Sequence, residues 1–158
     1  MSEEEKIKTA ICEKFSIQAD TVKIQRARRI WLEFPLEQFH NLLKFLYENH
    51  GCKILCTITG QDEKTSFSAM YHVAREDGIM INIKVMIPKE NPVIKSLCGT
   101  FPGGAIYERE LVDMFGITVE NLPPGNRYPL PENWPANQFP LRKDWNAEML
   151  DKKGEEKS

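Results

Sequence analysis

Hydrophobic positions recur along most of this chain with two different periods. Spacings of three and four residues mark helical segments, and alternation at every second residue marks strands. In chain order the pattern predicts a helix at 2–15, one bent or two short strands at 20–34, a helix at 35–51, three strands at 52–60, 66–76 and 78–88, a short helix or turn at 91–101, and a firmer helix at 102–116. This order predicts an α+β domain, with a mostly antiparallel sheet and helices packed on one face.

Residues at the ends of the segments support these boundaries. Ser2 followed by Glu5 fits a capping box at the start of the first helix. Gly51 and Gly116 stand where the second and the last helix should end, because glycine readily takes the left-handed conformation of a helix terminus. The domain is therefore expected to occupy residues 1–117.

The pattern changes in residues 118–146, which are predicted to form an arm. Six of the ten prolines fall here, so neither a helix nor a central strand can persist. The arm also holds large aromatic residues, which are rare in linkers, namely Tyr128, Trp134, Phe139 and Trp145. Each aromatic can bury ~150–250 Å². We expect an extended, ordered arm laid over a surface that belongs partly to another protein, followed by a flexible tail at 147–158.

Composition narrows the class of protein without indicating a reaction. The 158 residues are 41% hydrophobic and 28% charged, which is typical of a globular domain. A net charge of −2 gives no attraction to nucleic acid or anionic lipid. The sequence has no apolar run that could span a bilayer and no signal-peptide pattern at its acidic start. We expect a cytoplasmic protein that meets a membrane only through partner subunits.

Candidate chemistry is sparse. The four cysteines make no C-x-x-C pair, and none of the three histidines stands beside a cysteine or carboxylate at motif spacing. The glycine-rich run at 99–105 lacks the Lys and Ser/Thr of a phosphate-binding loop, so a tight turn is expected. An RNA-binding sheet would need aromatics on central strands and a basic surface, and the basic cluster at Arg26–Arg29 does not supply these. No cofactor, metal or catalytic residue is predicted in this chain.

The last predicted helix carries a charge within its apolar stripe. Leu111, Val112 and Phe115 follow Glu108 at i+3, i+4 and i+7, on the same side of the helix. A carboxylate there must find donors or a cation, or take up a proton. Backbone N–H groups of the 103–104 loop could satisfy it. Alternatively, Glu108 pairs with an arginine or another backbone loop and fixes the helix against the arm or a partner.

The polar side of the same helix carries an ordinary charge spacing. Arg109 and Asp113 stand at i,i+4, which predicts a surface ion pair worth a few tenths of a kcal/mol. Both residues also belong to a longer pattern that continues into the arm.

That pattern is a Glu-Arg-Glu triplet, an acidic residue, Phe-Gly-Ile and a downstream Pro-Leu-Arg-Lys-Asp. Its residues here are Glu108, Arg109, Glu110, Asp113, Phe115, Gly116, Ile117, Pro140, Leu141, Arg142, Lys143 and Asp144. The combination resembles the signature of the 30-kDa subunit family of respiratory complex I, which also occurs in membrane-bound, energy-converting nickel–iron hydrogenases. The resemblance covers about residues 20–146.

The resemblance implies an accessory subunit without a cofactor. In such complexes the domain and arm pack on a large subunit, which is the nickel–iron catalytic chain of a hydrogenase or its quinone-site counterpart in complex I. Iron–sulfur clusters are expected in neighbouring subunits, and the assembly is expected on the cytoplasmic face of the membrane. The motif residues, together with Arg127, Trp134 and Trp145, are then implied interface residues.

Two differences favour the hydrogenase branch, with complex I as the alternative. Members of complex I tend to have an aromatic residue where this chain has Val112. They also carry a Gly-His-Pro-Asp-Leu-Arg-Arg-like run after Phe-Gly-Ile, whereas this chain keeps Arg127 but lacks the histidine and the paired arginines.

Overall fold

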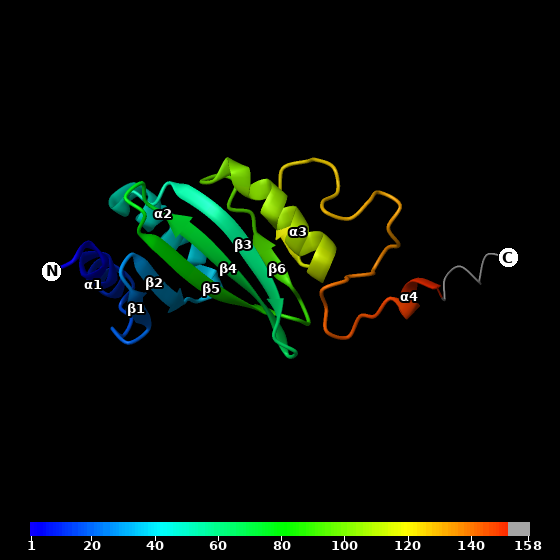
Figure 1. Ribbon diagram of the computed structural model, residues 1–158, viewed down its shortest axis with the longest axis horizontal. Coiled ribbons are helices and arrows are strands. Elements are labelled where there is room, and N and C mark those ends of the chain that lie inside the picture. The colour runs from blue at the N-terminus through cyan, green and yellow to red at the C-terminus, as the bar shows by residue number, and fades with distance from the viewer. Residues whose placement is uncertain (152–158) are drawn as a thin grey trace.

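A five-stranded sheet organises the protein in this computed structural model, which describes residues 1–151 (Figure 1). In chain order the elements are α1 (Glu3–Phe15), β1 (Val22–Arg26), β2 (Arg29–Glu33), the 3-10 turn η1 (Leu36–Gln38), α2 (Phe39–His50), β3 (Ile54–Asp62), β4 (Ser66–Ala74), β5 (Met80–Pro88), β6 (Val93–Lys95), the 3-10 turn η2 (Pro102–Gly104), α3 (Ala105–Phe115), β7 (Thr118–Glu120) and α4 (Glu148–Asp151).

The strands of the large sheet run in the order β1-β2-β5-β4-β3. Neighbours are antiparallel except β2 and β5, which pair in parallel because the intervening chain includes helix α2 and two strands. The segment at 20–34 is two short strands rather than one bent strand. The predicted α+β class with a mostly antiparallel sheet is confirmed.

Strict alternation along the central strand separates the two faces of the sheet. Ile81, Ile83 and Val85 of β5 are fully buried, whereas Asn82 and Lys84 point to the opposite face and are only partly buried. The buried side chains form one hydrophobic core with α1, α2 and α3, so the helices cover one face of the sheet as predicted.

Close approach of α3 to this face depends on a glycine. A Cβ on Gly60 of β3 would overlap Leu111 and Phe115 of α3. The missing side chain therefore gives the helix its packing position. On α2, Phe39 packs beside Tyr71, with ring centroids 4.2 Å apart.

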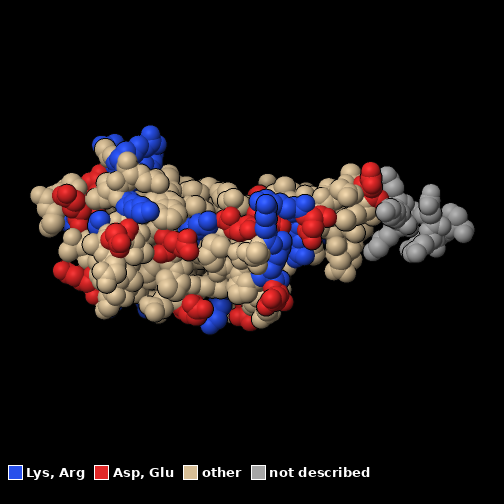
Figure 2. All heavy atoms as spheres, turned by 90° about the horizontal axis from the view of Figure 1, so that it is seen from below, with Lys and Arg blue, Asp and Glu red and all other residues tan. Residues whose placement is uncertain are grey.

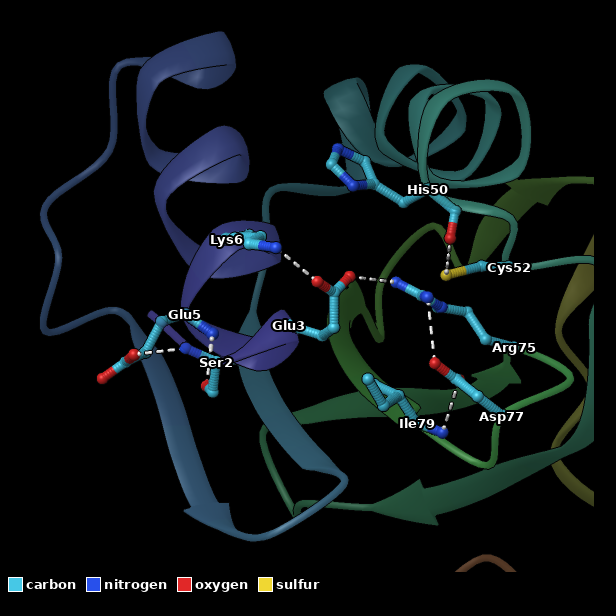
Figure 3. A network of polar contacts seen from close by, with 9 residues as sticks. All are labelled: Ser2, Glu3, Glu5, Lys6, His50, Cys52, Arg75, Asp77 and Ile79. Atoms are coloured by element: carbon cyan, nitrogen blue, oxygen red, sulfur yellow. Dashed lines mark hydrogen bonds and ion pairs between the residues drawn. The ribbon is translucent and has the colours of Figure 1, made fainter.

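The predicted end signals of the helices are confirmed. The Ser2 hydroxyl accepts a hydrogen bond from the Glu5 N–H, and the Glu5 carboxylate accepts one from the Ser2 N–H (Figure 3). Gly51 and Gly116 both take the left-handed conformation, with φ of 67° and 70°.

A polar network fixes α1 to the turn after β4. Figure 3 shows the Arg75 guanidinium between the carboxylates of Glu3 and Asp77, at 3.3 and 2.9 Å. Lys6 binds the other oxygen of Glu3 at 2.6 Å. These contacts lie far from the motif residues and stabilise the N-terminal end of the fold.

One element of the sequence prediction is wrong. Residues 91–101 contain the short strand β6, which pairs in parallel with β7, where a short helix or turn was expected. Three-residue strands leave almost no periodic signal, and β7 falls just inside the predicted arm. The last helix also begins at Ala105, because residues 102–104 form a 3-10 turn.

The rest of the arm, 121–146, contains no helix or strand, and it turns back onto the end of α3 (Figure 1). The Leu141 N–H donates to the Met114 carbonyl at 3.1 Å, so the arm lies against its own domain rather than stretching away from it. Of the tail predicted to be flexible, 147–158, the helix α4 occupies part, and 152–158 lie outside the described residues. No helix within residues 1–151 has the length and apolar character needed to cross a membrane.

Candidate interface at helix α3 and the arm

The motif residues, separated in sequence, meet where the arm folds over α3. We call this region the α3–arm junction: helix α3 with Gly116, the arm segments 123–130 and 134–145, and Asp62 at the end of β3. The start of α3 is fixed by Gly104, where a Cβ would overlap the Leu97 side chain.

Glu108 is completely buried and holds the start of α3 to the preceding loop. Its carboxylate accepts hydrogen bonds from the Leu97 N–H at 2.8 Å, the Ser96 hydroxyl at 2.7 Å and the Cys98 thiol at 3.3 Å. The donors come from residues 96–98, as one backbone N–H and two side chains, and not from residues 103–104 or from an arginine. That loop belongs to the same domain rather than to the arm, and it satisfies the carboxylate without a cation.

The predicted surface pair of Arg109 with Asp113 does not form. Arg109 Nη2 instead donates to the carbonyls of Pro123 and Pro124, at 2.9 and 3.2 Å. A Cβ on Gly125 would overlap the guanidinium, so the glycine lets the arm pass directly over it. Charge-assisted bonds to carbonyls are stronger than an exposed ion pair, which explains why the prediction was wrong.

Asp113 is buried and provides the second attachment of the arm to α3, after that of Arg109. One oxygen accepts from Arg127 Nε at 3.1 Å, and the other accepts from the Leu130 N–H at 3.1 Å. Arg127 Nη1 continues to the Trp134 carbonyl at 3.1 Å. The predicted residue Arg127 thus connects the helix to the middle of the arm.

A third contact closes the C-terminal end of α3. Arg142 Nε donates to the Phe115 carbonyl at 2.7 Å, which is one of the carbonyls left free at a helix end. The guanidinium lies 4.4 Å from the ring centroid of Phe139 and 5.0 Å from that of Phe67. Gly116 makes room for this layer, since a Cβ there would approach Phe139 at 2.6 Å.

Asp62 supplies a fourth contact, which the sequence analysis missed. Its carboxylate accepts from the backbone N–H of Lys143 at 3.0 Å, the N–H of Lys64 at 2.8 Å and Lys89 Nζ at 2.9 Å. Burial alone would raise the pKa of Asp62, but these donors outweigh it and lower the pKa to about 2. The hydrogen bond from the Lys64 N–H, two residues after Asp62, follows a local turn pattern that a sequence can show. The contact of Asp62 with the arm has no such local pattern.

The two tryptophans of the arm pack beside each other. The ring centroids of Trp134 and Trp145 are 6.3 Å apart, and both indole N–H groups donate to Gln138, at 2.9 and 2.7 Å. Both residues are only partly buried. Their polar atoms are satisfied while part of each ring stays available for contact.

The remaining predicted residues lie at the margins of the junction. Glu110 and Pro140 are partly buried, Leu141 is 48% exposed, and Asp144 is exposed. Within residues 1–151 neither acidic side chain makes a hydrogen bond or ion pair. Tyr128 adds another exposed aromatic surface.

The junction combines polar attachments of the arm with partly exposed aromatic residues. Across residues 1–151, no group of three or more His, Cys, Asp or Glu side chains is placed to hold a metal ion. The charged residues fix the arm, and Phe139 packs against Arg142, whereas Trp134, Trp145 and Tyr128 stay partly exposed. Such half-exposed aromatics are typical anchors of protein interfaces.

Two relatives match over very different lengths. The beta subunit of a membrane-bound hydrogenase from Pyrococcus furiosus is 29% identical over 141 residues, covering 85% of this chain and 82% of the relative. One subunit of the NADH-quinone oxidoreductase from Roseiflexus sp. is 36% identical over 81 residues, covering 51% of this chain and 47% of the relative. Both relatives are subunits of oxidoreductases, and the hydrogenase subunit shares nearly its full length with this chain.

Two solved structures share the fold. A chain of the membrane-bound sulfane sulfur reductase, an archaeal respiratory membrane complex, superposes with a TM-score of 0.80 over 98% of this chain and 92% of that chain, at 23% identity. A trypsin-resistant fragment of Nqo5 superposes with a TM-score of 0.65 over 78% of this chain and 100% of the fragment, at 21% identity.

The family model of the respiratory-chain NADH dehydrogenase 30 kDa subunit matches residues 32–149, which include the sheet from the end of β2 onward and the whole arm. The match covers well over half of the sequence and contains every residue of the α3–arm junction. The chain therefore belongs to the respiratory-chain NADH dehydrogenase 30 kDa subunit family.

Proposed function

We propose that this chain is a non-catalytic, cofactor-free accessory subunit of a membrane-bound, energy-converting nickel–iron hydrogenase. It packs on the large catalytic subunit through the α3–arm junction and stabilises the cytoplasmic part of a complex that couples electron transfer to ion translocation. The nickel–iron centre and the iron–sulfur clusters belong to that subunit and its neighbours. The observation that carries this proposal is the arm, whose polar groups are bound to α3 while its aromatic residues are only partly buried.

The polar contacts explain how such an arm can bind without a large entropic cost. Arg109, Asp113, Arg142 and Asp62 hold it at four separate points along its length. A surface already ordered before binding loses little conformational freedom when a partner arrives. The arm therefore presents Trp134 and neighbouring apolar groups in a fixed arrangement.

The length over which each relative aligns with this chain supports the hydrogenase branch. The hydrogenase beta subunit aligns over more than four fifths of both chains, whereas the NADH-quinone oxidoreductase relative aligns over about half of each. A subunit of a complex I-type quinone-reducing dehydrogenase is the alternative. The likeness to the sulfane sulfur reductase chain supports the fold and does not distinguish the branches.

Purification from native membranes in a mild detergent tests the proposal. With an affinity tag at the N-terminus, far from the arm, the chain should retain a large subunit that can be identified by mass spectrometry. Nickel in the eluate, with two nickel-ligating C-x-x-C motifs in that subunit, is the expected result. A large subunit without these motifs would support the alternative, and a chain that elutes alone would overturn the proposal.

A further inference from the structure

Four cationic residues gather around Asp62, where the tip of the β3–β4 hairpin meets the arm. We call them the basic strip: Lys64, Lys89, Arg142 and Lys143. Lys89 Nζ binds both oxygens of Asp62 and also the Lys64 carbonyl at 3.0 Å. Lys143 reaches the same carboxylate through its backbone N–H.

The aromatic ring of Phe67 connects the fourth cation to the others. Lys89 Nζ lies 5.1 Å from its centroid, and the Arg142 guanidinium lies 5.0 Å from it. Two cations of the basic strip come from the domain and two from the arm. The strip therefore exists only when the arm is folded onto the domain.

Positive charge in the basic strip exceeds the negative charge that it encloses. The Asp62 side chain is 1% exposed and is paired with Lys89. Arg142 binds a carbonyl and two aromatic rings, and none of these carries a charge. Lys64 and Lys143 are exposed, and within residues 1–151 their ammonium groups make no hydrogen bond or ion pair.

This excess does not follow from composition, because the whole chain has a net charge of −2. Figure 2 shows Lys and Arg side chains gathered in a narrow strip across one face, with Asp and Glu on either side. Acidic residues neighbour the strip in sequence as well, at Glu63, Glu90 and Asp144. The positive charge of this strip is therefore bordered by negative charge.

We propose that the basic strip docks a narrow acidic segment of the same large subunit that the arm contacts. The inference rests on the proposed function, and it adds the charge of the partner surface. A flat anionic membrane or a nucleic acid backbone would meet the flanking carboxylates as well as the lysines. A single acidic loop or helix edge fits between them, and like-charge repulsion on both sides fixes its register.

Docking at the basic strip also couples the partner to the arm. Lys143 and Arg142 are in place only when the arm is attached, so an acidic partner binds the attached state preferentially. By linkage, the partner then stabilises arm attachment by the same free energy with which attachment favours binding.

The test is a charge reversal that leaves the fold intact. Lys64 and Lys143 bind Asp62 only through backbone N–H groups, so the double substitution Lys64→Glu with Lys143→Glu keeps both hydrogen bonds. The matched control is Lys14→Glu with Lys95→Glu, two exposed lysines outside the strip that give the same change in net charge. Circular dichroism and urea unfolding check that both proteins are folded.

Binding of the full chain is measured to the remaining complex, purified from cells that lack this subunit. At about 50 mM salt the strip variant should bind roughly tenfold or more weakly than wild type, and the deficit should shrink at about 300 mM salt because exposed charges are screened. The control variant should bind within about twofold of wild type.

Binding of each protein to phosphatidylglycerol vesicles is measured in parallel. Three outcomes would overturn the inference: equal loss of complex binding in both variants, no such loss in the strip variant, or a loss in the strip variant that affects vesicle binding alone. In each of these cases wild-type binding to the complex still supports the proposed function. Absence of wild-type binding would instead refute the proposed function itself.

Discussion

Buried carboxylates anchor α3 and the arm in different ways. Glu108 has only neutral donors, from Ser96, Leu97 and Cys98, whereas Asp62 combines two backbone donors with the ammonium group of Lys89. Both side chains are almost inaccessible to solvent. A buried carboxylate is tolerated only when its oxygens are satisfied, so each one specifies the position of the segments that donate to it.

At Glu108 the substitution Glu108→Gln is expected to destabilise the protein by ~1–3 kcal/mol. The amide would keep one acceptor oxygen but place an NH₂ group against donors, which leaves buried groups unpaired. The urea unfolding midpoint measures the effect. Glu110→Gln, a partly buried neighbour without a hydrogen bond in the described residues, should leave the midpoint nearly unchanged. Equal midpoints for wild type and Glu108→Gln would contradict the prediction.

Asp62 should make stability depend on pH in the acid range. Its pKa falls from 3.8 to about 2 on folding, so its contribution is fully present above about pH 4 and is lost as the pH falls through about 2. The contribution is on the order of 2 kcal/mol. The difference in unfolding free energy between wild type and Asp62→Asn, measured from pH 6 down to about pH 2, should shrink over this window. A difference that stays constant across it would exclude this role.

Helix α3 packs on the sheet with one face, and polar residues outside that face bind the arm. Leu111 and Phe115 pack on the sheet, while Arg109 and Asp113 point to the arm. The end of the helix is shared, because Arg142 caps a terminal carbonyl of α3 from the arm. Gly116 ends the helix with its own backbone bonds, and Arg142 couples that end to the ordering of the arm.

The two helix-terminal glycines allow the coupling between the end of α3 and the arm to be tested. Gly116→Ala and Gly51→Ala carry the same left-handed strain, roughly 1–2 kcal/mol, but only Gly116 faces arm atoms within 4 Å. Gly116→Ala should therefore lower the melting temperature more than Gly51→Ala and should increase proteolysis within the arm. Limited proteolysis followed by mass spectrometry locates the cleavage sites. Matching melting temperatures and cleavage patterns would show that the arm does not depend on this contact.

Across the described residues, the domain provides the hydrophobic core, and we propose that the arm provides the contact surface for a partner. The core includes residues of all three long helices and of β4 and β5. The arm contributes mainly polar attachments and a pair of half-exposed tryptophans.

Substitution of those tryptophans should separate folding from assembly. Trp134→Ala and Trp145→Ala are each expected to cost the isolated chain less than about 2 kcal/mol, below the ~3–5 kcal/mol of a fully buried aromatic, but to reduce recovery of the large subunit strongly. Trp31→Ala is the matched control, because Trp31 is a partly buried tryptophan on the open face of the sheet. It should affect stability to a similar extent and assembly little. Similar losses of assembly in all three variants would contradict the division of roles.

Local structure could be predicted from the amino-acid sequence. Periodicity located the long helices and strands, and the capping box and the terminal glycines located helix ends. The proline-rich residues 121–146 contain no helix or strand, as their composition indicated. Glu108 in an apolar stripe indicated a buried carboxylate. These features depend on neighbours within a few residues, whose spacing is visible in the chain.

Contacts between distant groups required the folded protein. The i,i+4 spacing of Arg109 and Asp113 predicts that they pair with each other, yet both bind the arm. Lys143 reaches Asp62 across 81 positions, and β6 finds β7 across an intervening helix. No local pattern encodes such contacts, because their geometry exists only after the core has placed α3 beside the sheet and the chain has turned back over it.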